Sequence, residues 1–172
     1  TFACDMDTQV LRRTACEGGY FSYVAGVASY INEHYSVGGL RIHITRRTLP
    51  MKSGLSSSAA ICVLTARGFN RIYKLKLNTL GEMNIAFIGE QRTPSRCGRL
   101  DQACAFGVKP VHMTFDSNEV DVEPITLGGT FYWVIADLKA GKDTIKILSD
   151  LNKCYPFAEN DRERAVHEAL GA

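Results

Sequence analysis

A stretch of small and hydroxyl-bearing residues from 50 to 60 offers the most recognisable chemistry in the sequence. Gly54 lies among four serines that lead into an apolar segment with helical spacing, namely Ser53, Ser56, Ser57 and Ser58. A helix N-terminus exposes unpaired backbone N–H groups and carries about half a positive charge. Small residues let a phosphate approach that backbone, and hydroxyls can donate to its oxygens or bind Mg²⁺. The stretch therefore suits the binding of an anion such as a phosphate.

The residue types alone leave a simpler explanation open. Ser is a preferred N-cap and would follow a turn in front of many helices. The stretch is not a Walker A loop, because GxxxxGK[ST] is absent. Nor is it a nucleophile elbow, because GxSxG does not occur in it.

A second stretch, 89–102, contains two carboxylates at a suggestive spacing. Glu90 lies at the end of a predicted helix, and Asp101 follows eleven residues later, after the turn at Gly98. Taken singly, Glu90 is typical of a surface helix residue and Asp101 of an N-cap. Next to a phosphate loop, the pair would offer a metal ligand and a base.

Both stretches resemble the GHMP kinases, the superfamily of galactokinase, homoserine, mevalonate and phosphomevalonate kinases. The string PMKSGLSSSA at 50–59 is similar to the second signature of that family, in the form found in galactokinases; other branches usually have Gly in place of Ser56. CGRLDQ at 97–102 is close to the galactokinase pattern, whereas the spacing from Glu90 to Asp101 resembles the mevalonate branch. The two branches are therefore not separated by these motifs.

The resemblance implies a role for each candidate site residue. The reaction would be in-line transfer of the ATP γ-phosphoryl group to a hydroxyl, catalysed by positioning and charge neutralisation. Ser58 and Glu90 would bind Mg²⁺, Asp101 would be the catalytic residue that accepts the hydroxyl proton, and Gly98 would lie beside the substrate. The phosphates and cofactor would be bound by Lys52, Ser53, Gly54, Leu55, Ser56, Ser57, Ser58 and Ala59.

A cation beside Asp101 would keep that carboxylate ionised. Arg96 and Arg99 are candidates for this cation, with a solvated arginine as the alternative at both positions. The expected activity is that of a galactokinase-like sugar kinase using ATP and Mg²⁺. Two alternatives stay open: a mevalonate kinase-like enzyme of isoprenoid synthesis, and a non-catalytic sensor of sugar and ATP.

Hydrophobic spacing and turn residues predict the elements that would position these groups. Helices are predicted at 20–35, at 59–73 with Ala60, Val63, Leu64 and Ile72 facing inward, and at 79–91. A polar loop follows at 92–100, and a short helix begins near Asp101. Strands are predicted at 40–44 (half-buried), 111–115, 120–125 and 131–137 (buried), and further helices at 143–153 and 162–170.

Composition excludes several classes of protein. The chain has 172 residues, is 45% hydrophobic and carries a formal net charge of +2, which does not suggest nucleic-acid binding. The absence of a long uncharged apolar run predicts no membrane span. Six cysteines at irregular spacing without a CxxC pair favour reduced thiols in a cytoplasmic protein over a zinc site or a disulfide framework. The oligomeric state stays open.

The fold class expected is α+β. The resemblance implies a GHMP kinase N-terminal nucleotide-binding domain of the ribosomal-protein-like βαβ type over 1–140, incomplete at its N-terminus. Residues 141–172 would begin a ferredoxin-like C-terminal domain. Because the first and third family signatures are missing, we expect the central part of a longer kinase, inactive by itself, whose partner is a small sugar or another alcohol.

Overall fold

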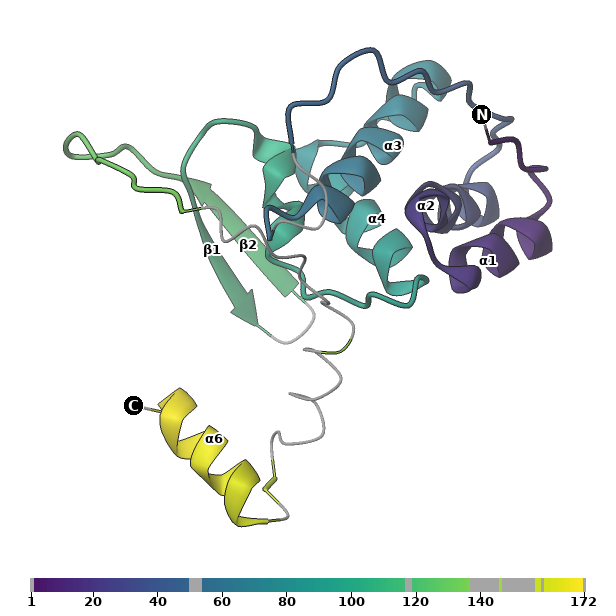
Figure 1. The fold of residues 1–172 in the computed structure, drawn as a ribbon. Coiled ribbons are helices and arrows are strands. Elements are labelled where there is room, and N and C mark those ends of the chain that lie inside the picture. Colours follow the sequence, from purple (N-terminus) through teal and green to yellow (C-terminus); the bar gives the residue numbers. More distant parts are fainter. Residues whose placement is uncertain are drawn as a thin grey trace.

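A group of helices and one β-hairpin make up most of the described chain (Figure 1). The computed structural model describes residues 2–49, 54–116, 119–136, 146, 157–158 and 160–171. The elements are the helices α1 (Thr8–Glu17), α2 (Tyr20–His34), α3 (Ser57–Tyr73) and α4 (Thr79–Gln91), the 3₁₀ helix η1 (Asp101–Phe106), the strands β1 (Val111–Asp116) and β2 (Glu119–Pro124), and helix α6 (Asp161–Gly171). This combination is α+β, as predicted.

Helix α2 lies in the middle of the helical group and contacts α1, α3 and α4. Its buried residues are mostly small, which lets the neighbouring helices approach closely: Ser22, Ala25, Gly26, Val27, Ala28, Ser29 and Ile31. The largest fully buried apolar side chains are Phe69, Ile31 and Met83, each from a different helix. The core is therefore formed between helices.

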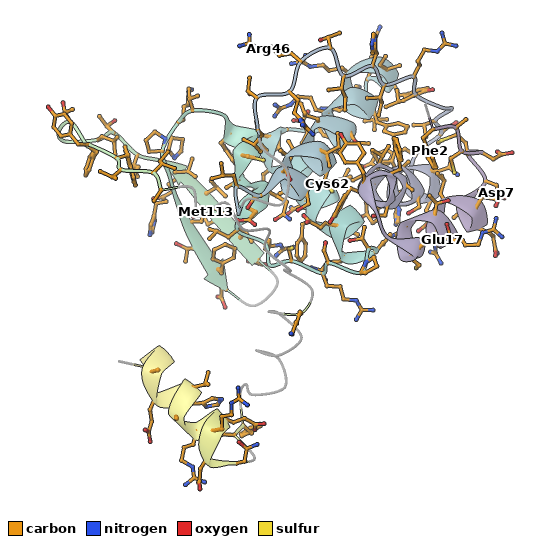
Figure 2. All side chains as sticks on the ribbon, in the orientation of Figure 1. Phe2, Asp7, Glu17, Arg46, Cys62 and Met113 are labelled. Atoms are coloured by element: carbon orange, nitrogen blue, oxygen red, sulfur yellow. The ribbon has the colours of Figure 1, made fainter. Side chains whose placement is uncertain are left out.

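The antiparallel hairpin pairs Val111 with Pro124 at one end and Asp116 with Glu119 at the other. Met113, labelled in Figure 2, and Val120 are partly buried and pack against the helical core. This is the only sheet in the part of the chain that the structure describes. The strands predicted at 111–115 and 120–125 are confirmed, whereas no parallel βαβ unit occurs among the described residues.

Two other predicted strands are wrong. Residues 40–44 are irregular, with Ile42 and Ile44 about half exposed. Residues 131–136 are also irregular, and Trp133 is 84% exposed instead of buried; residue 137 lies outside the described residues. Alternating or continuous apolar residues form a strand only where a neighbouring strand completes the hydrogen-bond ladder, and these segments have no such neighbour among the described residues.

The helices follow their predictions more closely. The helix at 79–91 is confirmed at both ends, and those at 20–35 and 162–170 within about one residue. In α3, Val63 is buried as predicted, but Leu64 and Ile72 are 61% and 66% exposed, so their predicted inward orientation is wrong. The face of α3 that packs is the one carrying Cys62, Ala66 and Phe69. The helix predicted at 143–153 lies outside the described residues except for position 146.

Helix α1 was not predicted, because only Leu11 and Ala15 give it a buried side. It begins with a capping interaction: Asp7 Oδ1 accepts hydrogen bonds from the backbone of Gln9 at 2.9 Å and Val10 at 3.0 Å. Such a cap satisfies two of the free N–H groups at a helix start. Figure 2 shows Asp7 at this end of α1.

An ion-pair cluster ties α1 and α2 to the end of α4. Arg92, the C-cap residue of α4, donates to both carboxylate oxygens of Glu33 on α2 at 2.7 and 2.9 Å. Arg12 on α1 donates to the same carboxylate at 2.8 Å. These hydrogen bonds, first from Arg92 and then from Arg12, lower the pKa of Glu33 to about 2.

The helices α2 and α4 cross at two glycines. A Cβ atom on Gly89 would lie 2.7 Å from the backbone nitrogen of Val27, and a Cβ atom on Gly26 would collide with the Gly89 carbonyl. Backbone atoms cannot move aside as a flexible side chain can. The crossing therefore requires glycine at both positions.

We expect Gly89→Ala to lower the free energy of unfolding by about 1–3 kcal/mol, because the added methyl group overpacks the crossing. The measurement is urea unfolding followed by circular dichroism. Gly68→Ala is the matched control within α3, since its Cβ would meet only the tip of Leu40 at 3.4 Å; it should leave stability unchanged or raise it slightly. Equal stability of the two variants would contradict the requirement for glycine at the crossing.

The Glu33 cluster predicts a defined pH dependence. Because the pKa of Glu33 is lowered from about 4.3 in an unfolded chain to about 2 in the folded one, its contribution is present above about pH 4.3 and is lost as the pH falls towards 2. Glu33→Gln should therefore flatten the decline in the free energy of unfolding between pH 5 and 2, measured by urea titration. Glu17→Gln, in an exposed pair 3.9 Å from Arg13, should not.

Candidate phosphate and metal site

The serine-rich stretch forms a turn that leads into α3. Gly54 and Ser56 both have left-handed backbones, with φ of 77° and 50°. Helix α3 begins at Ser57, two residues before the predicted start, so Ser57 and Ser58 belong to its first turn. Leu55 is half exposed and Ala59 is fully buried. Lys52 and Ser53 lie outside the described residues.

The simpler explanation of these serines was that one of them caps the helix through its side chain. The residue at the N-cap position does not do so. Ser56 is the N-cap residue of α3, but its side chain makes no capping hydrogen bond. Its left-handed conformation costs a non-glycine residue about 1–2 kcal/mol. Such strain at a helix start is a reason to look for function there.

Glu90 is fully buried, so its interpretation as a surface helix residue is wrong. Its Oε2 accepts a hydrogen bond from Nε2 of Gln102 at 2.7 Å. Its Oε1 has no hydrogen-bond partner among the described residues. Burying a charged oxygen without a partner is costly, and a cation is the kind of group that would compensate for it.

Asp101 is the first residue of η1 and is exposed, whereas Leu100 is the N-cap residue. The prediction of Asp101 as an N-cap is therefore wrong by one position. Gly98 lies in the preceding turn, where an added Cβ would contact nothing within 4 Å. Packing thus does not require glycine at this position.

Polar contacts anchor η1 to the helices that carry the other candidate residues. Arg67 on α3 donates to the Ala105 carbonyl at 2.8 Å and to Glu82 on α4 at 2.7 Å. Asn70 donates to the second oxygen of Glu82 at 2.8 Å. Asp101 and Gln102 are therefore held on a short helix that is fastened to both α3 and α4.

The thiol of Cys97 is affected by the charges of both Glu90 and Asp101. Burial raises the pKa of Cys97 to about 11, and the charges of Glu90 and, more weakly, Asp101 contribute. Desolvation also raises the pKa of the Cys104 thiol, although the residue is exposed overall, and both carboxylates raise it further. The geometric link is the hydrogen bond from Gln102, the residue after Asp101, to the Glu90 carboxylate at 2.7 Å, which brings the segment carrying Asp101 next to Glu90.

Helix α3 packs against both α4 and η1. Burial raises the pKa of Cys62 well above its usual value, with Glu90 as the next cause. Figure 2 shows Cys62 within the helical group. Ser58 lies four residues earlier, and residues at this spacing share one face of a helix. Ser58 is therefore one turn from a residue that lies close to Glu90.

Hydrogen bonds order the turn between the two carboxylates. Thr93 Oγ1 donates to the Glu90 carbonyl at 2.7 Å, Ser95 Oγ donates to the Tyr23 hydroxyl at 3.3 Å, and Gln91 donates to the Cys97 carbonyl. These residues and Gln102 were not predicted to belong to the site. For Thr93 and Ser95 the sequence signal was a threonine and a serine in a turn; Gln102 was marked only as the last residue of the CGRLDQ motif, with no role of its own.

Of the two arginines considered as cations near Asp101, Arg96 is exposed with φ of 41°. Arg99 is not simply solvated: its guanidinium lies 4.8 Å from the centre of the Phe87 ring. This stacking holds Arg99 against α4.

The donor set fits Mg²⁺ better than a metal bound by protein ligands alone. No group of three or more His, Cys, Asp or Glu side chains that could hold a metal occurs among the described residues. Mg²⁺ typically takes one or two carboxylates and completes its shell with water and substrate phosphates. Glu90, with one oxygen lacking a partner, is a suitable single carboxylate.

An α+β fold with a strained helix start and a buried carboxylate oxygen that lacks a partner among the described residues is compatible with a nucleotide-binding protein. Residues 22–108 match the family described as "GHMP kinases N terminal domain". The chain belongs to the GHMP kinase family. This range contains the described part of the serine-rich turn, Glu90 and Asp101.

Several curated galactokinases are similar to this chain. That of Pyrococcus furiosus is 37% identical over 112 residues, which are 63% of this chain and 32% of the relative. That of Thermotoga maritima is 36% identical over 114 residues, covering 61% and 31%, and that of Glaesserella parasuis 29% over 136 residues, covering 75% and 34%. The matched region thus spans about a third of each relative's length. No solved structure shows significant similarity.

Within the described residues, no helix combines the length and apolar character needed to cross a membrane.

The proximity of Glu90 and Cys97 can be tested without any ligand. Glu90→Gln should lower the pKa of Cys97 from about 11, because it removes a negative charge, while leaving it above its usual value because burial is the larger cause. The measurement is the pH dependence of the ¹³Cβ chemical shift of Cys97. Glu119→Gln on the hairpin is the control and should leave the pKa unchanged. An unchanged Cys97 pKa in Glu90→Gln would contradict the described arrangement.

Proposed function

We propose that the complete protein is an ATP-dependent small-molecule kinase that transfers the γ-phosphoryl group to a hydroxyl of a sugar, as a galactokinase does. The observation that carries this proposal is the fully buried Glu90, whose Oε1 lacks a partner, in the neighbourhood of Asp101 and of the face of α3 that carries Ser58. The similarity to curated galactokinases supports a sugar as the acceptor.

The backbone of 52–59 would bind the nucleotide phosphates at the start of α3. The free N–H groups at a helix start point towards a bound anion, and the helix dipole favours negative charge at that end. The left-handed backbones of Gly54 and Ser56 turn the chain into this position. With Ser58 in the first turn of α3, its hydroxyl would lie at the phosphates.

Mg²⁺, when bound, would neutralise charge on the β- and γ-phosphates. Glu90 Oε1 and the Ser58 hydroxyl are the protein atoms that would hold it. Asp101 would accept or orient the proton of the substrate hydroxyl, and its exposed position at the start of η1 makes it accessible to a small molecule. Gly98, with open space beside it, would leave room for that substrate.

This proposal includes a division of the chain. Residues 1–140 would belong to the nucleotide-binding domain, in which the family match lies, and 141–172 would begin a ferredoxin-like C-terminal domain.

We expect Asp101→Asn in the complete protein to abolish phosphoryl transfer from ATP to sugars while leaving Mg·ATP affinity nearly unchanged. An amide cannot accept the hydroxyl proton, whereas the phosphate and metal contacts remain. Turnover is measured with galactose, other monosaccharides and mevalonate by a coupled ADP assay, and Mg·ATP affinity by calorimetry. The control is Asp116→Asn on β1, which should retain activity.

Wild-type turnover by Asp101→Asn would contradict the role of Asp101. Phosphorylation of mevalonate but not of a sugar would place the protein in the other branch of the family. Binding of Mg·ATP without transfer to any acceptor would instead indicate a sensor.

A further inference from the structure

The amide of Gln102 is buried against the carboxylate of Glu90. Both side chains are fully buried. Gln102 Nε2 donates to Glu90 Oε2 at 2.7 Å, a short distance typical of a bond to a charged acceptor. The two remaining oxygens, Oε1 of Glu90 and Oε1 of Gln102, have no hydrogen-bond partner among the described residues.

The amide orientation follows from this pairing. With the opposite assignment, the Gln102 oxygen would face a carboxylate oxygen, which would be repulsive. The Cys97 thiol also interacts with the Glu90 carboxylate, but a thiol is a weak donor. Gln102 is therefore the one strong hydrogen-bond donor to this carboxylate among the described residues.

The position of Gln102 depends on the anchored helix η1. Arg67 holds this helix through the Ala105 carbonyl and through its ion pair with Glu82. Because η1 is fastened in this way, the Gln102 amide is a fixed point against which the Glu90 carboxylate is oriented.

We propose that Gln102 is a positioning residue for the metal ion: its amide holds Oε2 of Glu90 and so presents Oε1 alone for Mg²⁺ binding. The inference rests on the proposed function. The terminal torsion of a glutamate is soft, so an unrestrained carboxylate would rotate or bind through both oxygens. Mg²⁺ demands near-octahedral geometry, which favours one oxygen held in one direction.

A second consequence concerns the distance between metal ligand and base. Asp101 immediately precedes Gln102 on η1. The hydrogen bond from Gln102 to Glu90 therefore links the segment carrying Asp101 directly to the carboxylate on α4. Gln102 would set the position of the metal relative to the proton acceptor as well as the direction of the ligand oxygen.

The test compares Gln102→Met with Gln9→Met in the complete protein. Methionine keeps the length of glutamine and lacks its N–H donor. Gln9 is the control, because it is an exposed glutamine on α1, away from Glu90 and the turn that follows it. Mn²⁺ binding in the presence of ATP is followed by electron paramagnetic resonance, and ATP binding in EDTA by calorimetry.

We expect Gln102→Met to weaken Mn²⁺ binding about 10- to 100-fold, the usual effect of removing a group that orients a metal ligand. Metal-free ATP binding should stay within about twofold of the unsubstituted protein, whereas general structural damage would weaken both. Gln9→Met should bind Mn²⁺ normally. Unaltered Mn²⁺ binding by Gln102→Met, or an equal loss in both variants, would overturn the inference while leaving the proposed function intact.

Failure of the unsubstituted protein to bind Mn²⁺ with ATP would overturn the proposed function and this inference with it. If Gln102→Met does not fold, hydrogen exchange of the Gln102 side-chain amide in the unsubstituted protein decides the matter. Slow exchange that persists when Mg·ATP is added supports the inference. Fast exchange of this amide in the free protein, or a change from slow to fast exchange when Mg·ATP is added, contradicts the inference.

Discussion

The close crossing of α2 and α4 at Gly26 and Gly89 is the constraint on which the arrangement of the site depends. There the two backbones approach within the reach of a single methyl group. Glu90 directly follows Gly89 in α4, and its side chain is fully buried. The cost of burying a charge is several kcal/mol unless partners replace the lost water. The neighbouring turn and η1 supply only part of that replacement.

This partial compensation gives the site its electrostatic character. Burial raises the pKa of the Cys62, Cys97 and Cys104 thiols; the charge of Glu90 raises all three further and that of Asp101 the last two, so the thiols stay neutral. Neutral thiols add no further negative charge, and they also do not satisfy the carboxylate as strong donors would. The result is a buried carboxylate oxygen to which none of the described residues donates a strong hydrogen bond.

The Glu33 cluster and the Arg67 contacts anchor the two ends of the segment that joins α4 to η1. Arg92 begins the turn that leads from α4 towards Asp101, and its ion pair with Glu33 fastens that turn to α2. Arg67 fastens the other end of the turn, through η1, to α3 and α4. Asp101 lies eleven positions after Glu90 in the chain, yet anchoring both ends of the connection makes their relative position a property of the helical group.

Much of the helical structure could be predicted from the sequence, because helical spacing of apolar residues is a local property. This was sufficient for the helix at 79–91 and nearly so for those at 20–35 and 59–73. It was insufficient for α1, which has only two buried residues. The spacing of apolar residues gave wrong predictions for the strands at 40–44 and 131–137. A strand also requires a neighbouring strand to pair with, and the local sequence does not show whether one is present.

The same distinction between local and long-range information applies to the candidate site. The sequence by itself determined the family, the run of serines before a helix and the two acidic residues, because these depend on residue type and spacing. Only the tertiary structure decided that Glu90 is buried, that Gln102 is its partner and that α3 turns Leu64 towards solvent. The physical reason is that burial and hydrogen-bond partners arise from contacts between elements that are distant in the chain, and the residue types within one element do not specify those contacts.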